Sequence, residues 1–156
     1  MASRPIVAPY APDDHEGVVA LWRAVFPDAP ARNDPVLDIR RKLDVQPELF
    51  LVARVGRGVV GTTMAGFDGH RGWLHLVAVD PERRREGIGA GLLREAERRL
   101  AALGCPKLNL QVRASSPEVV RFYERLGYAV EPRISMGKVL AAGEAIEDPR
   151  LPNTSP

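Results

Sequence analysis

The spacing of apolar residues divides the chain into helical and strand-like segments. Apolar side chains that recur every three or four positions predict amphipathic helices, whereas alternating or continuous apolar runs of four to eight predict strands. Four segments have the helical spacing: residues 13–26, 35–45, 88–103 and 117–126. Five have the strand pattern: residues 6–10, 49–55, 59–67, 73–79 and 107–112. Two short closing strands are expected at 128–130 and 134–140.

Local sequence signals mark the ends of these elements. Asp34 followed by Pro35 is typical of a helix N-terminus, because the carboxylate caps a free N–H group and proline fits the first turn. Gly104 and Gly127 follow helical segments and predict their C-terminal ends. The tripeptide 56–58, Gly-Arg-Gly, predicts a tight hairpin between two strands.

The strand predicted over 73–79 should present alternate residues to its two faces. Strict alternation puts Trp73, His75, Val77 and Val79 on one face and Leu74, Leu76 and Ala78 on the other. In the helix predicted over 88–103, one face would carry Ile88, Leu92, Ala96, Leu100 and Leu103.

The order of elements favours a mixed α/β sheet. Two helices and an antiparallel meander come first, and a strand–helix–strand–helix–strand unit follows. We expect a single domain over residues 1–140. Residues 141–156 are polar, contain three prolines and are expected to form a flexible tail.

Composition narrows the class of protein. The chain has 156 residues, of which 45% are hydrophobic, and a net charge of +2, so neither nucleic acid nor a membrane surface is an expected partner. Cys105 is the only cysteine, which excludes an intrachain disulfide and a CxxC metal site. The first ten residues lack the apolar core of a signal peptide, so we expect a cytoplasmic protein.

The segment 83–91, Arg-Arg-Arg-Glu-Gly-Ile-Gly-Ala-Gly, carries the strongest chemical signal. It joins a predicted strand to a predicted helix, and glycines at a helix N-terminus let free N–H groups approach a phosphate. The P-loop motif is absent, and Leu92 stands where the dinucleotide fingerprint needs its third glycine. A phosphate site and an ordinary basic surface turn both remain compatible with this segment.

Two linked motifs resemble the GNAT family of N-acetyltransferases. Residues 84–89, Arg-Arg-Glu-Gly-Ile-Gly, are similar to the family's Gln/Arg-x-x-Gly-x-Gly/Ala motif, and residues 110–128 are similar to its second signature. The resemblance extends over about residues 5–140, and residues 69–73 resemble a bacterial subgroup of poorly defined substrate. It implies a mostly antiparallel sheet with one splayed parallel pair, flanked by about four helices.

The resemblance implies acetyl-CoA as co-substrate and no metal. It implies that backbone amides of 84–90 hold the pyrophosphate, and that main-chain groups of Val77 and Val79 pair with the pantetheine arm. Ser116 stands where the family usually has Asn, and its hydroxyl either caps the next helix or binds the cofactor. The expected cofactor-binding residues are therefore Val77, Val79, Arg84, Arg85, Gly87, Ile88, Gly89, Ala90 and Ser116.

Tyr123 matches the family tyrosine that protonates the departing thiolate. A phenol with a pKa near ~10 is protonated at neutral pH and suits this role. The alternative is that Tyr123 packs in the core with its hydroxyl bonded to backbone. The general base is open: His75 is the only titratable side chain on its strand, deprotonation through water is the alternative, and Glu82 and Glu86 are further candidates.

The expected activity is acetyl transfer from acetyl-CoA to a primary amine by direct attack. A non-catalytic acyl-CoA-binding regulatory module on the same fold is the alternative, and a basic nucleic-acid binder is a weaker one. The helices at 13–26 and 35–45 are expected to line the acceptor site. The acceptor is a small-molecule or peptide amine, and the protein is a monomer or a homodimer.

Overall fold

A computed structural model describes residues 3–140. The described residues fall into two compact units, residues 3–110 and residues 111–140. The predicted tail at 141–156 lies outside the described residues, and the single domain expected over 1–140 stays a prediction. Within the described residues, no helix has both the length and the apolar character needed to cross a membrane.

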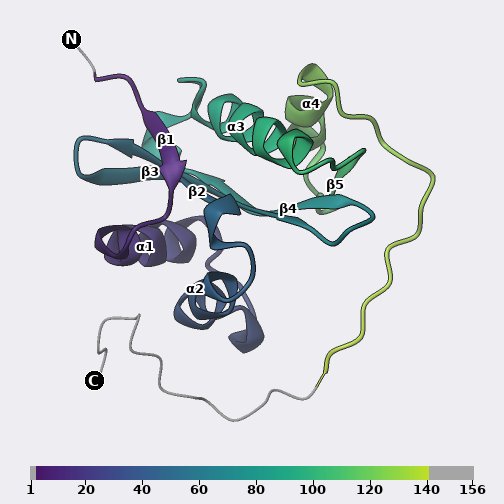
Figure 1. Ribbon diagram of the computed structural model, residues 1–156, viewed down its shortest axis with the longest axis horizontal. Coiled ribbons are helices and arrows are strands. Elements are labelled where there is room, and N and C mark those ends of the chain that lie inside the picture. Colours follow the sequence, from purple (N-terminus) through teal and green to yellow (C-terminus); the bar gives the residue numbers. More distant parts are fainter. Residues whose placement is uncertain (1–2, 141–156) are drawn as a thin grey trace. The chain divides into compact units, whose positions relative to one another are not determined.

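The first unit is built on a five-stranded sheet with the order β1-β2-β3-β4-β5 (Figure 1). Its strands are β1 (Ile6–Pro9), β2 (Phe50–Val55), β3 (Gly58–Phe67), β4 (Gly72–Val79) and β5 (Leu108–Leu110). Neighbours are antiparallel from β1 to β4, and β4 and β5 are parallel. The predicted mixed sheet with one parallel pair is confirmed.

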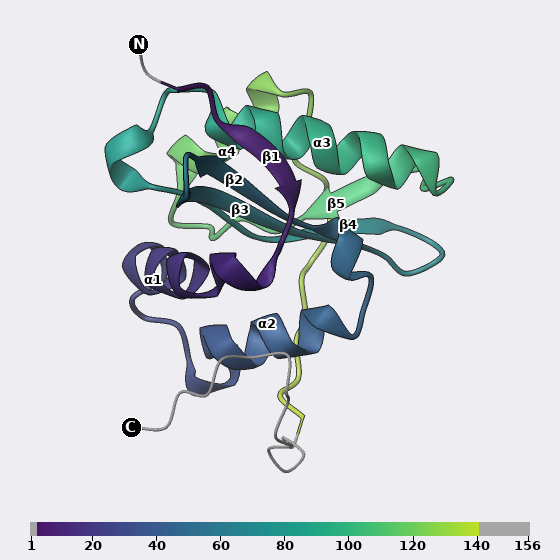
Figure 2. The ribbon, with the colours of Figure 1, turned by 60° about the vertical axis from the view of Figure 1, so that its left-hand side comes forward.

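Helices cover both faces of this sheet (Figure 2). Helices α1 (His15–Val25) and α2 (Pro35–Leu43) lie on one face, and α3 (Ile88–Ala102) lies on the other. On the α1–α2 face the buried core includes Val18, Trp22, Ile39, Phe50, Val52 and Ala78. The indole N–H of Trp22 donates to the Thr62 hydroxyl across 2.8 Å, which satisfies a polar group within this core.

The predicted ends of the elements are confirmed where the signals are local. The carboxylate of Asp34 accepts a hydrogen bond from the Leu37 N–H at 3.1 Å, and Pro35 opens α2. Gly104 and Gly127 have φ angles of +83° and +92°, the left-handed conformation that ends a helix. The hydrophobic face of α3 is correct from Ile88 to Leu100, but Leu103 lies after the last helical residue and is 49% exposed.

The second unit contains α4 (Pro117–Arg125), which agrees with the helix predicted over 117–126. The rings of Phe122 and Tyr128 meet the ring of Tyr123 edge-on, at centroid distances of 5.1 and 5.7 Å. The closing strands predicted at 128–130 and 134–140 were wrong, since these residues form neither helix nor strand. An apolar run indicates a strand only when a neighbouring strand completes its hydrogen bonds, and none does so here within the described residues.

Candidate functional site

Strand β4 is interrupted by a bulge at Leu76. The pairing with β3 shifts between Thr62, which lies opposite Ala78, and Met64, which lies opposite His75. Leu76 has a φ angle of +50°, a conformation rare for a branched side chain. The Thr62 hydroxyl donates to the Leu76 carbonyl at 3.0 Å and holds the bulge in place. Thr63, which falls in the register break, has a buried hydroxyl without a partner in the described structure.

The bulge changes which residues share a face of β4. His75 pairs with Met64, and Met64 packs against the α1–α2 core, to which Ala78 also belongs. Val79 pairs with Gly61, which lies against α3 on the opposite face. The strict alternation predicted for 73–79 is therefore wrong beyond His75, because the extra residue of the bulge reverses the order of the faces.

The second half of β4 has an open edge. Strand β5 pairs only with Gly72, Trp73 and Leu74, at Leu108–Leu110. Among the described residues, no strand continues this pairing along Leu76–Val79, so its outward N–H and C=O groups lack ladder partners. This is the edge that the sequence assigned to Val77 and Val79, and an edge of this kind can receive an extended, amide-bearing ligand.

The loop after β4 leaves a continuous run of backbone N–H groups without partners. A short 3-10 turn, Pro81–Arg83, is capped by the Asp80 carboxylate, which accepts from the Glu82 N–H at 3.0 Å. From Arg84 to Ala90, no backbone N–H donates a hydrogen bond to any acceptor within residues 3–140. The first donor of α3 with a helical acceptor is Gly91, whose N–H reaches the Gly87 carbonyl at 3.0 Å.

The shape of this loop suits an anion. Arg85 and Gly87 have φ angles of +67° and +78°, and such left-handed residues among right-handed ones turn successive N–H groups toward a common point. The helix dipole of α3 adds positive potential at the same end. Arg84 and Arg85 are exposed, whereas Arg83 pairs with Glu86 at 3.3 Å. A diphosphate therefore fits the chemistry of this loop, in which Arg83 neutralises the Glu86 carboxylate and the Asp80 carboxylate caps the preceding turn.

A close contact fixes the start of α3 over the sheet. A Cβ atom on Gly61 would lie 2.8 Å from the Ile88 side chain and 2.9 Å from that of Leu92. Only glycine at this position of β3 lets the first turns of α3 approach so closely. The predicted residues Ile88 and Gly89 are buried in that turn, and Ala90 is half-buried. Gly61 was not identified from the sequence, although a glycine within a strand is the signal for such an approach.

Two predicted residues belong to the second unit. Ser116 occupies the N-cap position of α4, but its side chain makes no capping hydrogen bond, and its carbonyl instead accepts from the Val119 and Val120 amides. Its hydroxyl is thus not committed to the helix. Tyr123 is buried, and burial raises the pKa of its phenol to about 12, so it stays protonated at neutral pH.

The candidate bases differ in their surroundings. Glu82 and Glu86 are exposed in the loop, and the ion pair with Arg83 occupies the Glu86 carboxylate. His75 lies one residue before the bulge, and desolvation lowers its pKa below the usual 6.5. The positive charge of Lys42, in α2, lowers the pKa of His75 further, and the negative charge of Asp38 raises it. Lys42 had not been singled out from the sequence.

Comparison with known proteins agrees with this architecture. A profile of the Acetyltransferase (GNAT) family matches residues 16–128. An acetyltransferase from Yersinia pestis (strain Pestoides F) is 44% identical over 128 residues, which are 82% of this chain and 90% of that protein. An acetyltransferase from Pectobacterium atrosepticum has the same identity and the same coverage. A further Yersinia pestis relative at 44% identity is described as an uncharacterized N-acetyltransferase.

Solved structures share the fold. An aminoglycoside N-acetyltransferase in complex with CoA superposes with a TM-score of 0.75 at 15% identity, over 90% of this chain and 98% of that one. Ard1 from Thermoplasma volcanium superposes with a TM-score of 0.71 at 25% identity, over 84% and 85% of the two chains. GNAT enzymes use acetyl-CoA and acetylate amine acceptors. The family profile and the relatives at 44% identity together show that this chain belongs to the GNAT family of N-acetyltransferases.

Proposed function

We propose that the chain transfers an acetyl group from acetyl-CoA to a primary amine by direct attack, with no covalent enzyme intermediate. The observation that carries the proposal is the run of unpartnered amides from Arg84 to Ala90. Along the chain, this run comes after the open edge of β4 and the short turn Pro81–Arg83. When bound there, acetyl-CoA supplies the acetyl group as a thioester. Every other contribution comes from orientation, charge and protons of the protein.

We assign the pyrophosphate to the backbone amides of 84–90. The amides of Gly87, Ile88, Gly89 and Ala90 belong to the helix N-terminus, and the side chains of Arg84 and Arg85 add two positive charges beside it. Charge-assisted hydrogen bonds of this kind are worth more than neutral ones. The geometry is present in the free protein, so binding requires little reordering of the loop.

We assign the extended arm of the cofactor to the open edge of β4 at Val77 and Val79. Main-chain N–H and C=O groups there can pair with amides as an added strand would. The bulge at Leu76 turns the backbone at this point, and N–H groups fixed in this way can polarise a carbonyl without reorganising during the reaction. Ser116 is proposed as a further cofactor contact, because its hydroxyl is not used to cap α4.

Tyr123 is proposed as the hydrogen-bond donor to the departing sulfur. Its phenol is protonated at neutral pH because burial raises its pKa to about 12. An ordinary thiol has a pKa of about 8.5, so donation of a hydrogen bond is favoured over complete transfer of the phenolic proton. The proposed effect of Tyr123 is to stabilise the negative charge that develops on sulfur.

An acetyl-CoA-dependent thiol-release assay over a panel of primary amines tests this function. The panel contains polyamines, amino sugars, lysine peptides and peptides with free N-termini. We expect at least one class to support turnover, with Tyr123→Phe lowering kcat about 100-fold and the neighbouring Tyr128→Phe leaving it nearly unchanged. Tight CoA binding without turnover on any amine would contradict the proposal and favour a non-catalytic acyl-CoA-binding module.

A further inference from the structure

His75 occupies a defined position on the α2 side of β4. It pairs with Met64 of β3, and Met64 packs against the α1–α2 core, so both side chains share that face of the sheet. His75 nevertheless remains exposed, whereas Leu76, which also packs against the α1–α2 core, is half-buried and Ala78 is buried. An imidazole that is in contact with the protein and also reaches solvent can exchange protons in both directions.

Lys42 of α2 and Gln46, which follows the helix, hold this segment against β3. The ammonium of Lys42 donates to the Ala65 carbonyl across 2.6 Å. The side-chain oxygen of Gln46 accepts a hydrogen bond from the Phe67 N–H at 2.8 Å, and its amide nitrogen donates to the Phe67 carbonyl at 3.1 Å. These bonds tie the end of α2 to the β3 segment that follows Met64, so the helix keeps its charges at a fixed place relative to His75.

Two opposite charges on α2 act on His75. Asp38 and Lys42 are one helical turn apart, and both interact electrostatically with the imidazole. Asp38 also pairs with Arg41 at 3.2 Å, and Lys42 is buried and has its pKa lowered to about 8 by desolvation. Two further carboxylates act within this cluster: Asp34 raises the pKa of Asp38, and Glu48 raises the pKa of Lys42.

Two features of β4 orient the imidazole. The Trp73 ring lies nearly parallel to it, with a centroid distance of 6.3 Å and an interplanar angle of 7°. The bulge at Leu76 follows His75 directly, and this is the point where the open edge begins. His75 therefore lies next to the backbone that the proposed function assigns to the reacting part of the donor.

We propose that His75 is the general base that removes a proton from the acceptor ammonium, and that Lys42 and Asp38 are positioning residues that set its protonation by their opposite charges. The proposal rests on the proposed acetyl transfer. It deepens that function by specifying the acceptor as an alkyl ammonium that approaches from the α2 side of β4.

The proton balance is as follows. One imidazole nitrogen takes a proton from R–NH3+, which gives R–NH2 and an imidazolium. The nitrogen lone pair forms the N–C bond to the acetyl carbon, and the C–S bond breaks with its electron pair on sulfur. The new amide nitrogen loses one more proton and the sulfur gains one. One proton is thus released overall, and the exposed imidazolium of His75 returns it to solvent.

The pH dependence of kcat/KM tests the role of His75. We expect wild-type activity to fall on the acid side with the pKa of His75, below 6.5. In His75→Gln, kcat/KM at pH 7 should fall about 100-fold or more and then rise with pH as the free amine becomes available. His70→Gln, in the exposed turn before β4, serves as the control and should keep the wild-type profile.

The charge variants test the positioning residues, with the imidazole titration followed by NMR as a readout independent of turnover. Lys42→Met removes a positive charge, so the pKa of His75 should rise, whereas Asp38→Asn removes a negative charge and should lower it. Lys42→Arg restores the charge and should restore the titration, which separates an electrostatic effect from a disturbed fold.

The possible failures are distinguishable. Wild-type protein that binds CoA but acetylates no amine would overturn the proposed function itself. Wild-type turnover with an unchanged acid limb in His75→Gln would overturn the role of His75 and leave the acetyl transfer intact. Shifts of the His75 titration in the same direction for Lys42→Met and Asp38→Asn would overturn the role of the two charges.

Discussion

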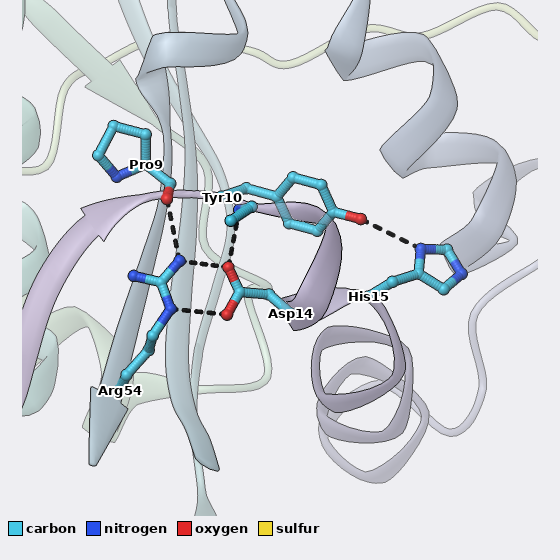
Figure 3. Close-up of polar contacts among 6 residues, drawn as sticks. Pro9, Tyr10, Asp14, His15 and Arg54 are labelled. Atoms are coloured by element: carbon cyan, nitrogen blue, oxygen red, sulfur yellow. Dashed lines mark hydrogen bonds and ion pairs between the residues drawn. The ribbon is translucent and has the colours of Figure 1, made fainter. Parts of the chain in front are cut away.

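Two arginine-containing regions of the first unit use their polar groups in opposite ways. Arg54 of β2 forms a two-point ion pair with Asp14 and also donates to the carbonyl of Pro9, the last residue of β1, at 3.0 Å (Figure 3). Asp14 further accepts from the Ala11 N–H at 2.7 Å, and only 5% of its side chain is exposed. In the loop after β4, Arg84 and Arg85 are exposed and the amides of 84–90 have no partners within residues 3–140.

The difference separates polar groups that hold the fold from those available to a ligand. The Arg54–Asp14 network satisfies its donors and acceptors within the protein, so its loss leaves buried charge uncompensated. The 84–90 loop leaves its donors to solvent, so its amides gain partners only when an anion binds. Substitutions in the first region should therefore change the free energy of unfolding, and those in the second should change the affinity for CoA.

The largest effect is expected for Arg54→Met. It leaves the buried Asp14 carboxylate without its counter-ion and should lower the free energy of unfolding by about 3 kcal/mol. Urea denaturation followed by circular dichroism measures this change. The double variant Asp14→Leu/Arg54→Met removes both charges and should recover part of the stability. An unchanged urea midpoint in Arg54→Met would show that the network does not support the fold.

The double variant Arg84→Ala/Arg85→Ala should lose affinity for CoA and keep the stability of the wild-type protein. Loss of two charged contacts to the pyrophosphate should weaken CoA binding about 30-fold, or about 2 kcal/mol. The free energy of unfolding should stay within about 0.5 kcal/mol of wild type. Isothermal titration with CoA measures the affinity, and Arg57→Ala in the exposed β2–β3 turn is the matched control. Equal CoA affinity in wild type and the double variant would remove these arginines from the site.

Alanine substitution of two glycines in this segment should change the stability of the protein in opposite directions. Gly87→Ala places a side chain at a φ of +78° and should cost about 1 kcal/mol of stability, and relaxation of the loop should also weaken CoA binding. Gly91→Ala lies within α3, meets nothing within 4 Å, and should stabilise the protein by up to ~1 kcal/mol. Thermal and urea unfolding of the pair measures both changes. A destabilised Gly91→Ala would contradict the helical account of this position.

The smallest effect on the free energy of unfolding is expected from protonation of His15, which lies near the Arg54–Asp14 ion pair. His15 is buried, its Nδ1 lies 3.2 Å from the Tyr10 hydroxyl, and desolvation lowers its pKa below 6.5 (Figure 3). The unfolded chain thus binds more protons between the folded pKa and 6.5, so the stability due to His15 is complete above 6.5 and is lost as pH falls through the folded pKa. Urea titrations between pH 7.5 and 5 should show a weaker pH dependence in His15→Gln, while a dependence as steep as that of wild type would exclude His15 as a source.

The features that the sequence predicted correctly depend on neighbouring residues. Asp34 caps α2, and Gly104 and Gly127 end their helices, because each position acts through contacts within one or two turns. The mixed sheet followed from the order of strands and helices along the chain. These are properties of short segments, and a single sequence contains them.

The features that were missed depend on residues distant in sequence. The bulge at Leu76 arises from its register with Thr62 and Met64, and no local pattern favours a positive φ at leucine. Lys42 and Asp38 become relevant only because α2 lies beside His75. The expected strands at 128–130 and 134–140 failed for the same reason, since a strand requires a partner that apolar alternation does not specify.

Amide hydrogen exchange measured by NMR, with and without CoA, tests whether the backbone amides of 84–90 bind the pyrophosphate. We expect the amides of 84–90 to exchange rapidly in the free protein and at least about tenfold more slowly with saturating CoA, as donors do when they gain acceptors. The Ala11 amide, bonded to Asp14, should be protected in both states. Amides of 84–90 that are already protected without CoA, or that exchange equally fast with it, would contradict the assignment of this loop as the pyrophosphate site.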